Sequence, residues 1–213
     1  MKSCIHDCVV EAGWRRRTLL RSRRFFSTAE LILFFKSHVL SYIEYRTSGI
    51  YHAASSNLAE LDRVLSGFLH QVGVSALDAL LHFNLAPLST RRDIAMLGFL
   101  HRVRLGFAPT ALSELFPLDV SDLRRSVRQA RHSHLFFVDT SGSQLCTFKR
   151  SVFGLTRIYN ILPHRIVSQK TVKDFQHELQ NAVKVRARLG FMQWDALFSP
   201  RLPVFNHPAR LVD

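Results

Sequence analysis

The sequence predicts an all-α protein. Apolar residues recur three and four positions apart in several segments, as they do on one face of an α-helix. Several of these segments begin with Ser or Thr and carry Asp or Glu three residues later, which is the spacing of an N-terminal capping box. Gly or Pro stands near the ends of the segments, where helices commonly stop.

The first predicted helix covers residues 27–46. Ser27 and Glu30 have the capping-box spacing, and Phe26 and Leu31 on either side of the cap fit a hydrophobic staple. The apolar face of this helix comprises Leu31, Phe34, Phe35, Val39, Tyr42 and Ile43. Residues 1–26 have little periodicity and six Arg, so we predict a basic N-terminal segment before the helix.

Three further helices complete a predicted bundle over residues 27–117. The second runs over residues 57–70, and a short third helix begins at the cap Ser75. Ser89 caps the fourth, which stops at Gly106. The shared apolar faces of these helices predict a buried interior of Phe35, Val39, Leu61, Leu65, Phe68, Leu97 and Leu100.

The rest of the chain forms a predicted basic helical region, residues 118–190. A polar helix over 121–131 places Arg124, Arg125, Arg128 and Arg131 along one face. Residues 132–150 are less regular, and 134–139 have the pattern of a short strand.

Two more helices are predicted beyond this less regular segment. They cover residues 151–161 and the stretch from Thr171 to Gly190. The tail, residues 191–213, holds three Pro and is expected to be extended.

Charge is the first indication of function. The 213 residues carry 29 Lys and Arg against 16 Asp and Glu, a net charge of +13. Residues 1–27 have a net charge of +5, residues 28–120 of −1, and residues 121–213 of +9. Such a basic excess favours a polyanionic partner, and we expect the RNA or DNA backbone. The alternative is a solvated face with local pairs, such as Asp122 with Arg125.

Nothing in the sequence points to catalysis or to a bound cofactor. The Asp and Glu residues are scattered, whereas polymerases and nucleases hold two metal ions on clustered carboxylates. No Gly-rich phosphate loop is present. Cys4, His6 and Cys8 lie close together but lack the second ligand pair of a zinc site. The longest apolar run, residues 31–35, is far short of the roughly 18 residues of a membrane span, so we expect no membrane partner.

Four short motifs occur in order along the chain. Residues 36–45 read K-S-H-V-L-S-Y-I-E-Y, residues 58–65 read L-A-E-L-D-R-V-L, and residues 85–106 contain the pair Arg91-Arg92. The fourth motif is Y-N-I-L-P at residues 159–163. In this order they resemble the region after the palm in reverse transcriptases of LINE-type (non-LTR) retrotransposons, from about residue 28 to 188. Two positions depart from the family pattern: Ser41 stands where the family usually has Pro, and Tyr159 where it has Trp.

The resemblance implies the helical thumb and the segment after it, which grip the template–product duplex in such polymerases. The family's palm, which lies upstream of this region, carries an Asp-Asp turn, and this sequence contains no Asp-Asp. We therefore expect a non-catalytic, thumb-like region that binds the nucleic-acid backbone without sequence specificity, with a palm domain as a further partner. The candidate contacts are Lys36, Arg91, Arg92, Arg124, Arg125, Arg128 and Arg131.

Two alternatives remain open at this stage. The chain could be a helical protein-interaction module that docks the apolar helix 28–46 on a partner such as the palm. It could also be a basic mitochondrial protein, because residues 15–29 are Arg-rich and contain Ser and Thr, as transit peptides do. Asp7 and Glu11 argue against a transit peptide, and a nuclear or cytoplasmic location is favoured.

Overall fold

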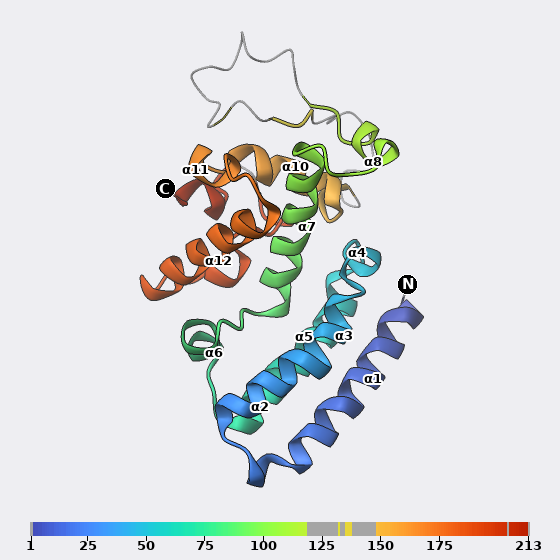
Figure 1. The fold of residues 1–213 in the computed structure, drawn as a ribbon, viewed down its shortest axis with the longest axis vertical. Coiled ribbons are helices and arrows are strands. Elements are labelled where there is room, and N and C mark those ends of the chain that lie inside the picture. Colours follow the sequence, from blue (N-terminus) through green and yellow to red (C-terminus); the bar gives the residue numbers. More distant parts are fainter. Residues whose placement is uncertain (1, 119–131, 133–134, 138–147, 204, 213) are drawn as a thin grey trace. The chain divides into compact units, whose positions relative to one another are not determined.

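The computed structural model describes residues 2–118, 132, 135–137, 148–203 and 205–212 (Figure 1). Of the described residues 71% are helical and none lies in a named strand, which confirms the predicted all-α class. The chain divides into two compact units, unit 1 (Met1–Arg92) and unit 2 (Asp93–Asp213). The sequence suggested a boundary near residue 117 instead.

Unit 1 consists of helices and short helical turns that follow one another closely (Figure 1). In chain order they are α1 (Lys2–Arg21), η1 (Arg23–Phe25), α2 (Thr28–Phe35), η2 (Lys36–Leu40), α3 (Ser41–Glu44), α4 (Thr47–Ile50), α5 (Ser55–Val72) and α6 (Ala76–Phe83). The element η2 is one wide π-helical turn within the helix predicted over residues 27–46.

The expectation that the first strong element begins at Ser27 is wrong, because residues 2–21 form the long helix α1. Ile5, Cys8 and Ala12 are buried on the inner face of α1, which packs against α5. These side chains have helical spacing, but they are few, two of them are small, and an Arg-rich half follows them. The apolar periodicity of residues 2–21 was therefore too weak to predict a helix from the sequence.

The side chain of Arg16 connects α1 with α5. Arg16 extends from α1 across α5, and its Nη1 donates to the carbonyl oxygen of Val64 at 3.5 Å. A Cβ atom at Gly67 would lie only 2.5 Å from this nitrogen. A larger residue at position 67 would therefore displace the flexible end of Arg16 from the backbone of α5.

The core of unit 1 is apolar and agrees with the prediction. The rings of Phe35 and Phe68 stack with their centroids 4.2 Å apart. All seven residues predicted for the interior are buried: Phe35, Val39, Leu61, Leu65, Phe68, Leu97 and Leu100. The last two belong to unit 2, so the predicted interior is shared between two units and is not one bundle.

The predicted cap of α2 is also confirmed. The Glu30 backbone N–H donates to Ser27 Oγ at 3.4 Å, and the Ser27 backbone N–H donates to Glu30 Oε2 at 2.8 Å. Hydrogen bonds from Ser27 hold the pKa of the Glu30 carboxyl below its ordinary value. Phe26, just before the cap, meets the ring of Phe34 edge-on at 5.0 Å. The turn between α1 and α2 is thus fixed at its α2 end.

Unit 2 begins inside a helix. Its elements are α7 (Leu88–Arg104, whose first turns belong to unit 1), α8 (Thr110–Glu114), α10 (Val152–Ile161), α11 (His164–Val167), α12 (Val172–Arg188), η3 (Trp194–Ala196) and η4 (Pro208–Leu211). Ser89 lies within α7 and is not its cap, contrary to the prediction. Thr171 caps α12 as predicted, since its Oγ1 accepts from the Asp174 N–H at 3.0 Å.

Aromatic rings and buried polar groups make up much of the interior of unit 2. The His101 ring of α7 stacks on Phe175 of α12, with centroids 4.1 Å apart and an interplanar angle of 6°. The Tyr159 hydroxyl of α10 lies 2.8 Å from His101 Nδ1. Phe136 packs edge-on against Tyr159 at 5.0 Å. Three helices and an irregular segment therefore meet around Tyr159.

The tail is folded and not extended as predicted. It contains the turns η3 and η4, and Leu197, Phe198 and Val212 are buried. His207 holds two parts of the tail together, because its Nε2 lies 2.8 Å from the Ser199 carbonyl oxygen and its Nδ1 accepts from the Ala209 N–H at 3.1 Å. Side-chain hydrogen bonds and burial replace the regular secondary structure that the Pro residues prevent.

The predicted Arg-rich helix over 121–131 lies outside the described residues. So do residues 134, 138 and 139 of the predicted strand, and the turn at 140–143. Among the described residues of this region, Leu118 and Phe136 form an isolated antiparallel bridge.

No single described helix has both the length and the apolar composition of a membrane span. The pair α5 and α6 meets the composition test only when taken together, and it is bent by 84°.

Candidate nucleic-acid interface

Three of the predicted contact residues lie in unit 1, and each has a protein partner. Lys36 Nζ donates to the Phe83 carbonyl oxygen at the end of α6. The Arg91 Nε forms an ion pair with Glu44. Arg92 donates from both terminal nitrogens to the Asp62 carboxylate, at 2.7 and 3.1 Å.

The Arg92 pair is a structural contact. Its side chain is 6% exposed, and its bidentate bonds to Asp62 fix the first turns of α7 to α5. A phosphate would have to displace this carboxylate in order to bind Arg92. The sequence could identify the Arg91-Arg92 pair, but it could not show that carboxylates from two other helices meet the pair.

The other four predicted contacts, Arg124, Arg125, Arg128 and Arg131, lie outside the described residues. Their role as phosphate contacts stays a prediction.

Many of the described acidic side chains are occupied in caps and ion pairs. Glu30, Asp78 and Asp174 belong to helix caps. Glu11, Glu44, Asp62 and Glu178 pair with Arg15, Arg91, Arg92 and Arg165. These pairs neutralise acids and bases one for one, so the surplus positive charge falls on the remaining Lys and Arg side chains.

One concentration of these cations lies where α1 turns into α2. Arg17, Arg21, Arg23 and Arg24 are all exposed there. None of the four forms an ion pair within the described part of the chain. Phe25, between them and the cap of α2, is 69% exposed, and the Arg24 Cζ lies 4.7 Å from its ring centroid. These four arginines are not among the predicted contact residues, although the run R-S-R-R-F-F at residues 21–26 is visible in the sequence.

The outer face of α12 in unit 2 is a second basic surface. Phe175, Leu179 and Val183 are buried on the inner face of this helix. The helical spacing places Lys173, His177, Asn181, Lys184 and Arg188 together on the opposite face.

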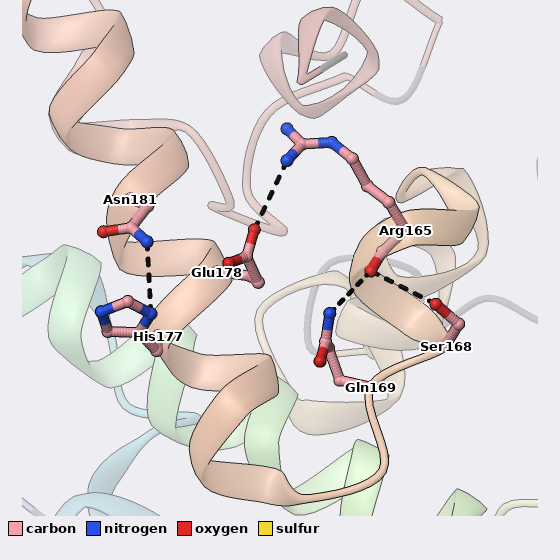
Figure 2. A network of polar contacts seen from close by, with 6 residues as sticks. All are labelled: Arg165, Ser168, Gln169, His177, Glu178 and Asn181. Atoms are coloured by element: carbon pink, nitrogen blue, oxygen red, sulfur yellow. Dashed lines mark hydrogen bonds and ion pairs between the residues drawn. The ribbon is translucent and has the colours of Figure 1, made fainter.

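Figure 2 shows two residues of this surface, His177 and Asn181, and a neighbouring ion pair. His177 and Asn181 are joined by a 3.2 Å hydrogen bond, and Glu178 of α12 pairs with Arg165 of α11 at 3.4 Å. Because Glu178 is occupied in this way, it does not offset the lysines on the outer face.

The buried polar groups of unit 2 form hydrogen bonds that connect different segments of the core. His101 Nε2 lies 2.9 Å from the Gln169 carbonyl oxygen, which can only accept, so this nitrogen carries the proton and Nδ1 accepts from the Tyr159 hydroxyl. Burial raises the pKa of Tyr159 well above its ordinary value and keeps this donor protonated. Asn160 holds the Phe136 backbone through two bonds of 2.9 Å. These contacts tie separate segments together inside the core.

No group of three or more His, Cys, Asp or Glu side chains in the described residues is arranged to hold a metal ion. Cys8 is buried, which raises the pKa of its thiol, whereas Cys4 is exposed on the same helix. A high thiol pKa disfavours the thiolate that a metal or an electrophile requires.

No protein-family model, curated protein or solved structure matches this chain.

Proposed function

We propose that this chain is a non-catalytic, thumb-like protein that binds the phosphate backbone of RNA or DNA without reading sequence. The observation that carries the proposal is which charged side chains are paired within the protein and which are not. Many of the described acidic side chains are engaged in caps and ion pairs, while arginines and lysines gather on the α1–α2 turn and on the outer face of α12. Unpaired cations on a chain of net charge +13 attract phosphates through counterion release, which needs no contact with base edges.

The local geometry at Ser41 supports the comparison with the reverse-transcriptase thumb. At this position, where the family usually has Pro, the chain has just passed the wide turn η2, and the Ser41 N–H donates to the carbonyl of Lys36, five residues earlier. The carbonyl of Ser37, four residues earlier, accepts from the Ser41 hydroxyl. In this chain the Ser41 N–H bonds to Lys36 and not to the Ser37 carbonyl. A proline at position 41 has no N–H, so it would likewise give the Ser37 carbonyl no backbone donor. The wide turn η2 therefore lies just before the position where the family usually has Pro.

The structure offers less support for the two alternatives. The apolar face of residues 28–46, which a docking module would present to a partner, is buried in the core of unit 1 through Phe35, Val39 and Ile43. Cleavage near Ser27, as in a transit peptide, would remove α1 and expose the core that Ile5 and Cys8 cover.

A salt series tests the proposal. Binding of the purified chain to a labelled duplex is measured by fluorescence anisotropy, and a dissociation constant on the order of 10⁻⁴–10⁻⁶ M at physiological salt is expected. Affinity should fall steeply with salt, and changing Arg124, Arg125, Arg128 and Arg131 together to Gln should reduce both the affinity and the slope of log K against log salt. Binding too weak to measure at low salt would contradict the proposal.

A control for an arginine that is held by a carboxylate is the single change Arg92→Gln. It also removes a positive charge, but from a side chain already held by Asp62, so the salt slope should stay at the wild-type value. The absence of catalysis has its own measurement. Template-dependent nucleotide incorporation by the chain with Mg²⁺ or Mn²⁺ would show that the non-catalytic assignment is wrong.

A further inference from the structure

The turn between α1 and α2 is held by hydrogen bonds and a ring contact, and it presents both charge and an aromatic ring. We call the segment 21–26 the arginine–phenylalanine corner. Ser22 Oγ donates to the Leu19 carbonyl oxygen at 2.7 Å, and the Phe25 N–H donates to the Ser22 carbonyl oxygen at 2.9 Å. At the other end, the ring of Phe26 packs against Phe34 of α2. The backbone on both sides of Phe25 is therefore held before any ligand arrives.

The helix dipole of α1 accounts for only one of the positive charges at the corner. A cation at the last turn of α1 is stabilised by the helix dipole, and Arg21 occupies that position. Arg23 and Arg24 lie beyond the end of α1 and are exposed. Glu30, which lies a few residues further along, accepts from both the N–H and the hydroxyl of Ser27. Its carboxylate forms no ion pair with the arginines among the described residues.

Phe25 is the second element of the corner. Its side chain is 69% exposed, and the Arg24 guanidinium lies over its ring. Proteins that bind single strands combine cations that follow the backbone with aromatic rings on which unpaired bases stack. A base within a duplex is already stacked on its neighbours and cannot offer its face to such a ring.

We infer that the arginine–phenylalanine corner binds single-stranded nucleic acid, with phosphates on Arg21, Arg23 and Arg24 and one unstacked base on the ring of Phe25. This inference rests on the proposed function and adds to it a location and a preference for single strands. The corner precedes residue 28, so it lies outside the stretch that resembles the reverse-transcriptase thumb.

An anionic membrane would also attract three arginines, but the structure favours nucleic acid. A helix that lies on a membrane buries its apolar face among the lipids. The apolar face of α1 is already occupied, because Ile5, Cys8 and Ala12 pack inside unit 1. At the corner itself, the apolar surface open to a membrane is limited to Phe25 and the partly exposed Phe26, because the exposed Val10 and Trp14 lie further back on α1.

The test compares two pairs of variants. Phe25→Ala is paired with Phe107→Ala, which removes a ring of similar exposure (65%) in unit 2. The double change Arg23→Gln and Arg24→Gln is paired with Lys149→Gln and Lys170→Gln, which remove the same charge from exposed positions of unit 2 outside both basic surfaces. Each is titrated by anisotropy against an oligothymidylate of about 12 nucleotides, a duplex of equal length, and vesicles containing an anionic phospholipid.

We expect Phe25→Ala to weaken binding to the oligothymidylate about five-fold or more, because the loss of one base–aromatic stacking contact typically lowers affinity by that factor. Its affinity for the duplex, and both affinities of Phe107→Ala, should stay within about two-fold of wild type. For the Arg23, Arg24 variant, the slope of log K against log salt for the single strand should also become shallower, by about 0.7 for each phosphate contact removed. The Lys149, Lys170 variant should keep more of its single-strand affinity than the Arg23, Arg24 variant.

Three results would overturn the inference. If Phe25→Ala binds the oligothymidylate as wild type does while the wild-type chain still binds the duplex, the corner assignment fails and the proposed function stands. If the wild-type chain binds neither nucleic acid, both fail. If the Phe25 and arginine variants lose vesicle binding but keep single-strand affinity, the corner is a membrane contact. Unchanged helicity and thermal midpoint of each variant, checked by circular dichroism, show that a loss arises from the surface and not from unfolding.

Discussion

The two units of this chain solve the same problem, burying apolar surface with helices, in different ways. Unit 1 packs aliphatic and phenylalanine side chains, as in the stacked pair Phe35 and Phe68, and keeps its ion pairs at the edge of the core. Unit 2 places hydrogen-bonded polar groups, His101 and Tyr159, among its buried rings. The stability of unit 1 should therefore depend on volume, and that of unit 2 on hydrogen bonds and pH.

This contrast can be measured because each unit has one tryptophan. Trp14 belongs to unit 1 and Trp194 to unit 2. In a Trp194→Phe background the fluorescence change on urea unfolding reports unit 1 alone, and in a Trp14→Phe background it reports unit 2. Separate probes are needed because two units need not unfold in a single transition.

The largest effect is expected in the core of unit 1. Phe68→Ala removes a fully buried ring that stacks on Phe35, and Leu65→Ala removes a buried side chain one turn away. We expect losses of about 3–5 and about 2–5 kcal/mol in the free energy of unfolding, from transfer and cavity costs together. Leu33→Ala, on the exposed side of α2, is the control and should change stability by less than about 0.5 kcal/mol. A similarly small loss for Leu65→Ala would mean that its face is wrongly assigned.

The next effect concerns the ion pair at the edge of that core. Asp62→Ala leaves the guanidinium of Arg92, only 6% exposed, without its carboxylate, and should cost about 1–3 kcal/mol in unit 1. Glu11→Ala breaks the exposed pair with Arg15 and should cost less than about 1 kcal/mol. Equal losses in urea unfolding would show that burial does not distinguish the two pairs, and Arg92 would again be a candidate for phosphate binding.

A smaller effect is expected from the polar interior of unit 2. Tyr159→Phe keeps the ring that Phe136 and Phe175 contact and removes only the hydroxyl bonded to His101 Nδ1. The expected loss is about 1 kcal/mol, the usual value of one such hydrogen bond. If the variant, measured with Trp194 fluorescence, is as stable as wild type, the hydrogen bond contributes little to stability. The proposed contrast between the two cores would then be wrong.

The smallest effect is a pH dependence confined to unit 2. Burial, and to a lesser extent Arg210, lower the pKa of His207 below its ordinary value of 6.5, so the folded state holds this ring neutral. The unfolded chain then binds the proton at higher pH, and stability falls as the pH drops below about 6.5. We expect a slope of at most about 1.4 kcal/mol for each pH unit.

The control for this prediction is His207→Asn, since an asparagine can still accept the N–H of Ala209 but does not titrate. Urea unfolding of the variant should show a weaker fall in unit 2 stability between about pH 7 and pH 5. If the variant keeps the full acid dependence of wild type, another group of unit 2 is responsible.

The sequence by itself determined the class of this protein, most of its helices and the core of unit 1. Capping residues such as Ser27, Ser75 and Thr171 act on backbone groups three residues away, so their effect is local and can be read from spacing. Leu61 and Phe68 were predictable for a similar reason, because one face of an amphipathic helix must be buried whatever covers it.

Only the tertiary structure decided which charges are available and where the units divide. Arg92 and Arg24 are equivalent as letters in the sequence, yet one is enclosed by a carboxylate thirty positions away and the other is exposed beside Phe25. The helix α1 was missed because its few buried side chains count only once α5 packs against them. Ion pairs and burial depend on distances between segments far apart in the chain, and local spacing carries no information about those distances.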